Sequence, residues 1–273
     1  MSIFSYLRDK REVTKTYKAV YGRPINWRHP IRYTEKLAIF KISQEAEKLW
    51  SYVDKIEVRK FVSQQIGNEY LTKLYGTYNS PEEIDFDKLP NSFVLKTTHG
   101  SGWNIIVPDK SKLDFADAKK KLAHWMTLNY YDSFGRERQY KLIKPRILCE
   151  EYLETKDKDL YDFKFYCFHG VPKSINVIRD RSGRVKKSMY EIPWKKSEMK
   201  AWDAQEEIDM EAPKNLGRML KIAKKLSTPF EQVRVDLYEL KGRIIFGELT
   251  FSSGGGMSPF DPDRFDEIYG AWW

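Results

Sequence analysis

Residues 232–250 read Gln232-Val-Arg-Val-Asp-Leu-Tyr-Glu-Leu-Lys-Gly-Arg-Ile-Ile-Phe-Gly-Glu-Leu-Thr250. Two runs of β-branched, aromatic and aliphatic residues flank Lys241-Gly242, a pair typical of a tight turn. The pattern predicts a hairpin of strands 232–238 and 243–250. The two strands of a hairpin pair in antiparallel order, so the pattern favours an antiparallel sheet.

Charged residues occupy alternate positions of both strands. Alternate residues share a face, so Arg234 lies beside Asp236, and Glu248 beside Thr250. Two carboxylates and an arginine in an otherwise apolar hairpin are costly unless they bind something. Magnesium takes few protein carboxylates together with phosphate oxygens and water. The pattern indicates either a metal site at Asp236, Glu248 and Thr250 or an ion pair with Arg234.

A second polar feature lies upstream, in strands predicted at 92–97 and 104–107. Lys96 ends the first strand, and the small-residue loop His99-Gly100-Ser101-Gly102 follows it. Backbone N–H groups of such a loop can close over phosphate oxygens, and a lysine adds charge. The spacing is not that of a P-loop, and the alternative is a plain hairpin turn.

Acidic residues also stand in and beside the strand predicted at 146–153. Glu150, Glu151, Tyr152 and Leu153 end it, where they either accept hydrogen bonds from a nucleotide or are merely solvated. Asp162 and Lys164 share one face of the next strand. Lys164 therefore either reaches a phosphate or forms a surface pair.

The remaining pattern combines helices and hairpins without regular βαβ alternation, which predicts an α+β fold with antiparallel sheets. The helices are expected at 3–21, 34–50, 54–67, 116–129 and 216–226. A further hairpin is expected at 162–168 and 173–178, followed by a turn at Arg181-Ser-Gly183 and another strand.

Composition sets further bounds. The 273 residues carry a formal net charge of +9, which favours anionic partners. Cys149 and Cys167 lie in apolar stretches, as buried free thiols do. The chain starts without a signal-peptide pattern and contains no run long enough to span a membrane, so a cytoplasmic setting is expected. The first helix either packs on the body or lies on a membrane through Phe4 and Leu7.

Taken in order, these features resemble the ATP-grasp superfamily. The chain looks more narrowly like its TupA-like branch, named for teichuronopeptide biosynthesis, over roughly residues 20–270. The segments that carry this resemblance are Phe93-Val-Leu-Lys96 with His99-Gly-Ser-Gly102, Arg138-Gln-Tyr-Lys141 with Lys144-Pro-Arg146, Asp162-Phe-Lys-Phe165, Val233-Arg-Val-Asp-Leu-Tyr238, and Gly247-Glu-Leu-Thr-Phe251.

The resemblance implies two lobes whose antiparallel sheets clasp ATP. Lys96 and Lys164 would contact its phosphates, and residues 99–102 would form a lid. Residues 150–153 would frame adenine and ribose. Arg234 would steady the transferring phosphoryl group, while Mg²⁺ would bind Asp236, Glu248 and Thr250, where Thr250 replaces the usual asparagine. The implied division is a helical segment at 1–53, a small lobe at 54–149 and a large lobe at 150–273.

The implied activity is an ATP- and Mg²⁺-dependent carboxylate–amine ligase, with a uronic acid of a bacterial surface polysaccharide as the acid and a small amine as the acceptor. Arg138, Tyr140, Lys141 and Arg146 lie in a stretch expected to bind an acidic substrate. A kinase acting on a sugar hydroxyl and a glycosyltransferase are the alternatives. A nucleic-acid-binding module is disfavoured by the acids Asp236 and Glu248 in the expected cleft.

Overall fold

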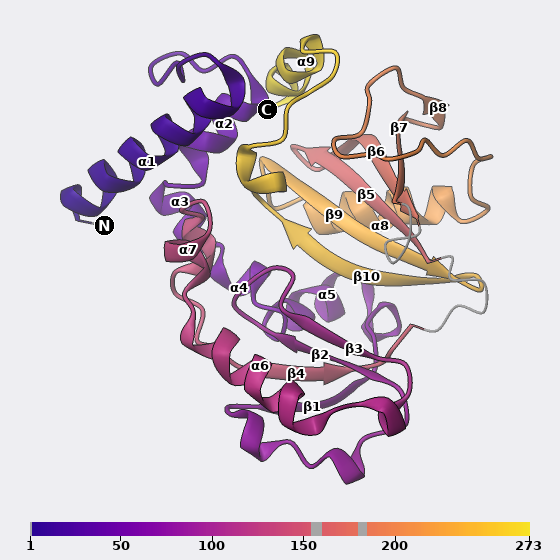
Figure 1. Cartoon of the computed structure of the whole chain (residues 1–273). Helices are drawn as coiled ribbons and strands as arrows, with labels where there is room; N and C mark the ends of the chain where they lie inside the picture. Colours follow the sequence, from indigo (N-terminus) through magenta and orange to yellow (C-terminus); the bar gives the residue numbers. More distant parts are fainter. Residues whose placement is uncertain (1, 154–159, 180–184) are drawn as a thin grey trace.

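The computed structural model describes residues 2–153, 160–179 and 185–273 of the chain. It contains two antiparallel sheets, one above the other in Figure 1, with helices around them. A smaller sheet has the strand order β1-β4-β2-β3, and a larger sheet has the order β10-β9-β5-β6-β7-β8. The predicted α+β class is confirmed.

The strands are β1 (Leu74–Tyr78), β2 (Phe93–Thr97), β3 (Asn104–Val107), β4 (Ile147–Glu150), β5 (Tyr161–Phe168), β6 (Val171–Arg179), β7 (Lys186–Glu191), β8 (Lys195–Lys196), β9 (Gln232–Leu240) and β10 (Arg243–Thr250). The hairpins β2–β3, β5–β6 and β9–β10 confirm the predicted pairs. β1 and β8 were not predicted. The turn expected at residues 181–183 lies outside the described residues.

The helices are α1 (Ile3–Tyr21), α2 (Tyr33–Phe40), α3 (Gln44–Lys48), α4 (Trp50–Val53), α5 (Val58–Ile66), α6 (Phe115–Thr127), α7 (Tyr130–Ser133), α8 (Leu216–Ser227) and α9 (Arg264–Trp272), with short 3₁₀ turns that include η5 (Arg138–Tyr140) and η6 (Ser253–Gly256). Among these described helices, none combines the length and the apolar character needed to cross a bilayer.

The prediction of a single helix at 34–50 is wrong, because this stretch forms α2, α3 and the start of α4. The hydroxyl of Ser43 accepts a hydrogen bond from the Ala46 N–H at 3.1 Å, which caps a new helix and ends the previous one. The next predicted helix also starts late, since α5 begins only at Val58. The Asp54 carboxylate accepts from the backbone N–H groups of Ile56 and Glu57, in the turn that precedes α5.

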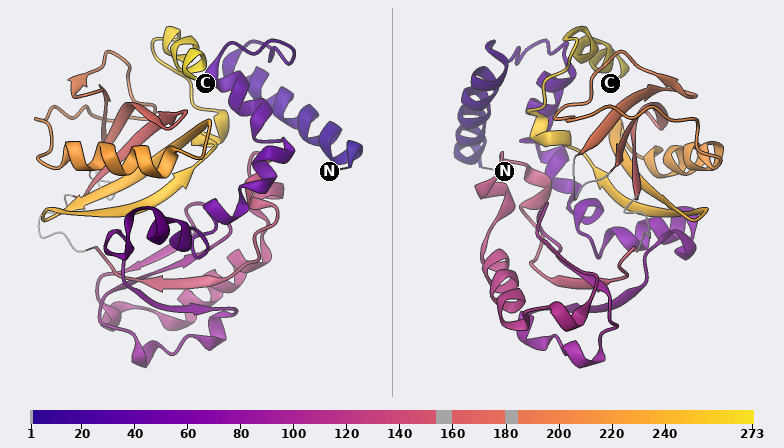
Figure 2. Two further views of the ribbon diagram at one scale, coloured as in Figure 1. Left: turned by 180° about the vertical axis from the view of Figure 1, so that it is seen from behind. Right: turned by 45° about the vertical axis from the view of Figure 1, so that its right-hand side comes forward.

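The larger sheet has one apolar and one polar face. Alternate side chains of β5, β6, β9 and β10 pack with α8 into the main core, in which Phe165, Val235 and Leu226 have no exposed surface. Figure 2 shows α8 lying across this face in the left-hand view. The opposite face of the same strands is therefore free to carry polar side chains, and the candidate site lies on it.

The smaller sheet encloses a second core. Phe93 and Leu95 of β2 pack with Ile147 and Cys149 of β4 and with Leu122 of α6. Cys149 and Cys167 are both free and buried, as expected. Their thiols have raised pKa values, about 12 for each, because burial disfavours the thiolate.

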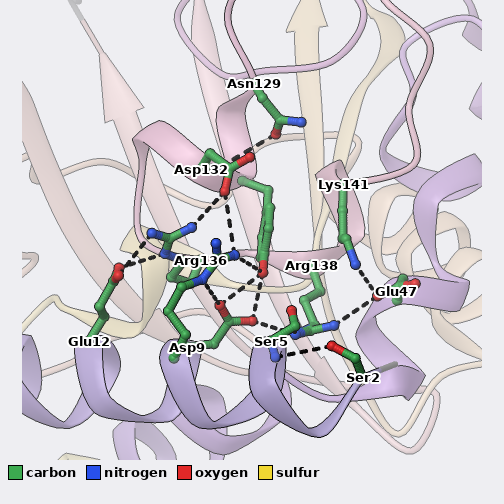
Figure 3. Close-up of polar contacts among 12 residues, drawn as sticks. Ser2, Ser5, Asp9, Glu12, Glu47, Asn129, Asp132, Arg136, Arg138 and Lys141 are labelled. Carbon is green, nitrogen blue, oxygen red and sulfur yellow. Dashed lines mark hydrogen bonds and ion pairs between the residues drawn. The ribbon is translucent and has the colours of Figure 1, made fainter.

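Helix α1 is attached to the body by a buried ion pair. Asp9 of α1 binds the guanidinium of Arg138, and neither side chain has any exposed surface. The hydroxyl of Tyr131 donates to both oxygens of Asp9 at 2.8 Å, and Arg138 also binds Glu47 at 3.0 Å. Figure 3 shows Asp9 of α1, Arg138 of η5 and Glu47 of α3 pointing toward one another.

Candidate functional site

A β-bulge determines which way Glu248 points. The turn at Lys241 and Gly242 pairs Leu240 with Arg243, and the ladder runs regularly to the pair of Leu237 and Phe246. Gly247 is then an extra residue, so that Glu248, rather than Gly247, lies opposite Asp236. The bulge places both carboxylates on the polar face of the sheet.

Arg234 is the centre of the resulting cluster. Its Nε donates to Asp236 Oδ1 at 2.7 Å, and its Nη2 lies 2.8 Å from Asp236 Oδ2 and 2.8 Å from Glu248 Oε1. The same Nη2 donates to Thr250 Oγ1 at 2.9 Å. Nη1 donates to the hydroxyl of Ser253 in η6 at 3.3 Å. The four residues predicted from the hairpin are therefore brought together.

Lys164 joins this cluster from the neighbouring strand. It lies opposite Asp236 in the β5–β9 ladder, and its ammonium group binds that carboxylate directly. Its Nζ also lies 3.1 Å from Asp162 Oδ2. Lys164 and Asp162 are both buried, so the sequence alternative of a surface pair is wrong for them.

The two acids of the hairpin differ in environment. Asp236 is buried, and desolvation raises its pKa even though Arg234 and Lys164 act in the opposite direction. The Glu248 side chain is 51% exposed. Desolvation acts to raise its pKa as well, but attraction to Arg234 and Lys164 dominates and lowers it. Glu248 is therefore the anionic member at neutral pH that solvent can reach.

The donor set fits a magnesium ion. Carboxylate oxygens of Asp236 and Glu248 meet at a single nitrogen atom, beside the hydroxyl of Thr250. A cation that displaced the guanidinium would find the same oxygens. No group of three or more histidine, cysteine or acidic side chains that could hold a metal occurs among the residues that the structure describes. Two carboxylates suit Mg²⁺, which keeps water and phosphate ligands.

Lys96 and Glu150 form the matching cluster on the smaller sheet. The Lys96 ammonium group binds Glu150 Oε1, and the Thr72 hydroxyl donates to the other oxygen at 2.6 Å. Arg59 lies 3.7 Å from the same carboxylate. Glu150 is buried, and although desolvation acts to raise its pKa, these cations lower it. The Lys96 side chain is 32% exposed, so a ligand can reach it from solvent.

The Gly-rich loop is fixed at its start and exposed at its tip. His99 is buried, its Nε2 lies 3.1 Å from the carbonyl oxygen of Trp125, and burial lowers its pKa. Gly100 leaves no room for a side chain, because a Cβ there would lie 2.4 Å from the Trp103 ring. Ser101 and Gly102 are exposed. These two residues are the part of the loop that can close over a nucleotide.

In the segment after β4, Glu151 makes polar contacts, whereas Tyr152 and Leu153 are partly exposed. The strand ends at Glu150, earlier than predicted. Glu151 lies 3.2 Å from Arg243 and accepts from the backbone N–H of Lys73. Tyr152 and Leu153 are partly exposed. Their expected role beside adenine stays a prediction, as do the domain boundaries proposed at residues 53 and 149.

Lys55 is a residue that the sequence reasoning missed. It follows α4, and its ammonium group donates to the carbonyl oxygen of Gly100. Burial lowers its pKa to about 8; Glu248 acts to raise it and Lys96 to lower it. Lys55 is thus within electrostatic reach of acids and bases from both sheets. No local pattern pointed to it, because its neighbours come from distant parts of the chain.

Buried side chains hold the small-residue loop after β10, which contains η6, in place. Lys41 donates to the carbonyl oxygen of Gly255 at 2.6 Å, and Gln139 donates to the Ser252 hydroxyl at 3.0 Å. Burial lowers the pKa of Lys41 to about 8 and raises that of Glu137 to about 7. These contacts fix η6, whose Ser253 binds Arg234.

The stretch expected to bind an acidic substrate is used differently. Arg138 is fully buried against Asp9, so the expectation is wrong for this residue. Arg146 binds Asp54 and Glu57, at 3.1 and 2.8 Å. Lys141 lies 3.6 Å from Glu47. These basic side chains join the N-terminal helices to the body.

A family model described as TupA-like ATPgrasp matches residues 35–273. The chain belongs to this family. The match confirms the resemblance read from the sequence and, with the two antiparallel sheets, the ATP-grasp fold. No curated protein matches this ATP-grasp chain.

Solved structures resemble this ATP-grasp chain only distantly. D-alanine–D-alanine ligase from Bacillus anthracis shares 15% identity at a TM-score of 0.48, over 78% of this chain and 66% of that one. D-alanine–D-alanine ligase from Helicobacter pylori shares 13% identity at a TM-score of 0.43, over 81% of this chain and 60% of that one. N5-carboxyaminoimidazole synthase from Aspergillus clavatus shares 12% identity at a TM-score of 0.43, over 77% of this chain and 46% of that one. The chain thus spans from about half to about two thirds of these proteins.

Proposed function

We propose that this chain is an ATP- and Mg²⁺-dependent carboxylate–amine ligase that works through an acyl phosphate. The observation that supports it most directly is the meeting of Asp236 and Glu248 at Arg234, beside Lys164. Family membership supports ATP as the phosphoryl donor. The solved ligases named above bear on the fold alone, so the reaction remains our proposal.

The chain's own residues would act by positioning and by charge. Lys96, Lys55 and Lys164 would hold phosphate oxygens, and residues 150–153 would contact adenine and ribose. Arg234 would leave the carboxylates and stabilise the transferring phosphoryl group. Mg²⁺, held by Asp236, Glu248 and Thr250, would neutralise phosphate charge. Phosphoryl transfer depends mainly on such positioning and neutralisation.

Two bond exchanges complete the proposed reaction. A carboxylate oxygen of the acid substrate forms a bond to the γ-phosphorus, the bond to the bridging oxygen breaks, and ADP leaves. The amine nitrogen then forms a bond to the acyl carbon, inorganic phosphate leaves with the former carboxylate oxygen, and the amine loses a proton to solvent. The products are an amide, ADP and phosphate.

We propose a uronic acid of a bacterial surface or capsular polysaccharide precursor as the acid, a small amine as the acceptor, and the cytoplasm as the location. The branch to which the chain belongs supports this pathway by analogy alone. The net charge of +9 supports an acidic substrate.

Helix α1 supports a place beside the membrane. Ile3, Phe4 and Leu7 are 69%, 82% and 54% exposed, and Arg11 and Lys15 lie on the exposed side of the same helix. An apolar end followed by cations suits an anionic lipid surface. Phe4→Ser should reduce cosedimentation with vesicles containing phosphatidylglycerol, and equal binding by the variant would reject this contact.

The test of the ligase is chemical. The protein is incubated with ATP, Mg²⁺, hydroxylamine and glucuronate labelled with ¹⁸O in its carboxylate. We expect a hydroxamate, and one labelled oxygen in the released phosphate. A phosphate ester on a sugar hydroxyl, with the label retained by the sugar, would instead identify a kinase.

A further inference from the structure

A cavity of about 210 Å³ lies on the polar face of the larger sheet. Its other walls come from helix α2, the segment 253–260, Tyr269 of α9, and Met199, Lys200 and Trp202. Its floor consists of side chains from four adjacent strands, namely Arg234, Lys164, Tyr166, Asn176, Ile178, Lys187 and Met189. The cavity begins at the two cations that bind Asp236 and extends across β5, β6 and β7.

Among the described residues, the charged side chains that line this cavity are all cationic. Four cationic side chains contribute to its lining, and no acidic side chain does so among the residues that the structure describes; the four are Lys164, Lys187, Lys200 and Arg234. Their acidic partners lie outside this lining: Asp236 binds both Arg234 and Lys164, and Asp261 lies 2.9 Å from Lys200. A carboxylate in the cavity would meet these cations directly, whereas an ammonium group would be separated from the acids by them.

The middle of the cavity suits a hydroxylated ring. Asn176 lies opposite Lys164 in the β5–β6 ladder, and its buried Oδ1 has no hydrogen-bond partner among the described residues. A buried acceptor without a partner is costly, and a ligand hydroxyl would relieve that cost. Tyr166, Met189 and Phe260 add flat apolar surface around it.

A second compartment continues the cavity outward. It measures about 400 Å³ and shares six lining residues with the first, namely Lys187, Met189, Met199, Lys200, Trp202 and Pro259. Trp202 is 55% exposed at this shared wall. The outer compartment carries both signs of charge, including Lys196 and Glu207. It gives room for a substrate that is longer than one ring.

We infer that the inner cavity binds the acid substrate, and that this substrate is a sugar-type acid: a hydroxylated ring bearing a carboxylate, with no ammonium group beside it. The substrate's carboxylate would lie at Arg234 and Lys164, and its ring would lie at Asn176. Any further sugar units of the substrate would extend past Trp202. The fate of the carboxylate rests on the proposed function, but its place of binding does not.

The inference separates this site from one that takes an α-amino acid. An α-amino acid carries its ammonium group within one carbon of the carboxylate. In this cavity that group would lie beside Lys164 and Arg234 with no acid in the lining. A sugar acid brings the same carboxylate but only hydroxyls to the same place, and these can donate to Asn176.

Binding measured by calorimetry tests the inference without turnover. The probes are glucuronate, glucose and alanine, each titrated into the full chain saturated with a non-hydrolysable ATP analogue and Mg²⁺. Asn176→Leu removes the amide, and Ser258→Phe fills the cavity from its wall. Asn91→Leu is the matched control, because Asn91 is exposed at a distant turn. Thermal unfolding and binding of the ATP analogue verify that each variant is folded.

Glucuronate should bind wild type at least tenfold more tightly than glucose or alanine does. Asn176→Leu and Ser258→Phe should each weaken glucuronate binding at least tenfold, while Asn91→Leu leaves it unchanged. The inference fails if wild type does not bind glucuronate, if alanine binds as tightly, or if neither cavity variant has an effect. Binding as expected without hydroxamate formation would uphold the cavity and reject the ligase.

Discussion

Asp236 and Glu248 lie directly opposite each other in the β9–β10 ladder. An unbroken ladder from the turn would have placed Glu248 opposite Val235, on the face that packs against α8. A one-residue shift moves a side chain to the other face of a sheet. The extra residue at Gly247 therefore decides whether the second acid belongs to the site or to the core.

Asp236→Asn should abolish ATP turnover and leave the fold intact. The amide keeps the shape of the side chain but loses the charge that would hold a metal ion, while Asp162 and Glu248 remain to neutralise Lys164 and Arg234. ADP release at limiting Mg²⁺ and a thermal melt measure the two effects. Asp85→Asn, at an exposed position, is the control. Wild-type turnover in the Asp236 variant would remove the metal assignment.

Gly247→Ala should lower both turnover and stability. A Cβ at this position would lie 3.0 Å from the Tyr238 ring and 3.1 Å from the Asp236 carbonyl oxygen, so the bulge must distort. We expect a loss of about 1–3 kcal/mol of unfolding free energy, typical of overpacking. Gly217→Ala in α8 meets no atom within 4 Å and should be neutral or slightly stabilising. Similar melts for both variants would show that the bulge tolerates a side chain.

The bulge also marks the limit of sequence reasoning at this site. Alternation correctly placed Arg234 with Asp236 and predicted the hairpin. It could not fix the register across the hairpin, because a glycine in a strand reads equally as a regular residue or as a bulge. The hairpin pattern therefore predicted that both acids belong to one site, but not that Glu248 lies directly opposite Asp236.

Residues joined across long distances escaped prediction for a different reason. Lys55 meets Gly100, and Lys41 meets Gly255, through contacts that no local spacing encodes. Arg138 shows the opposite error. As part of a basic stretch it suggested a binding surface, yet it is fully buried because Asp9, far away in sequence, neutralises it. Local patterns predict elements, whereas charge pairing depends on how these elements pack.

Lys96→Ala should weaken ATP binding by about 1–3 kcal/mol, or roughly 5- to 150-fold in Kd, if the ammonium group makes a charge-assisted phosphate contact. Glu150 keeps Thr72 and Arg59 as partners, so the small sheet should remain folded. Calorimetry with an ATP analogue gives the affinity. Lys88→Ala, whose side chain is 84% exposed, is the control. An unchanged Kd would mean that Lys96 only neutralises Glu150.

ATP affinity should fall as the pH rises above about 8. Burial lowers the pKa of Lys55 to about 8, so the group loses its charge there in the free protein. The phosphates favour the charged form and raise this pKa, so binding takes up a proton at higher pH. Calorimetry from pH 7 to 9.5 should show a weakening that Lys55→Met abolishes. A slope that persists in Lys55→Met would point to Lys41, whose pKa is also lowered to about 8.

Asp9 and Arg138 provide a test of how α1 is attached. Asp9→Leu and Arg138→Met should each cost about 3–5 kcal/mol of unfolding free energy, because each leaves a buried charge without its partner. The double variant should cost less than the sum, since both charges are then gone. Denaturant unfolding of the four proteins gives the coupling energy, and ATP binding by the folded double variant verifies that the site is intact. Additive losses would mean that Asp9 and Arg138 act independently, through their other partners, Tyr131 for Asp9 and Glu47 for Arg138.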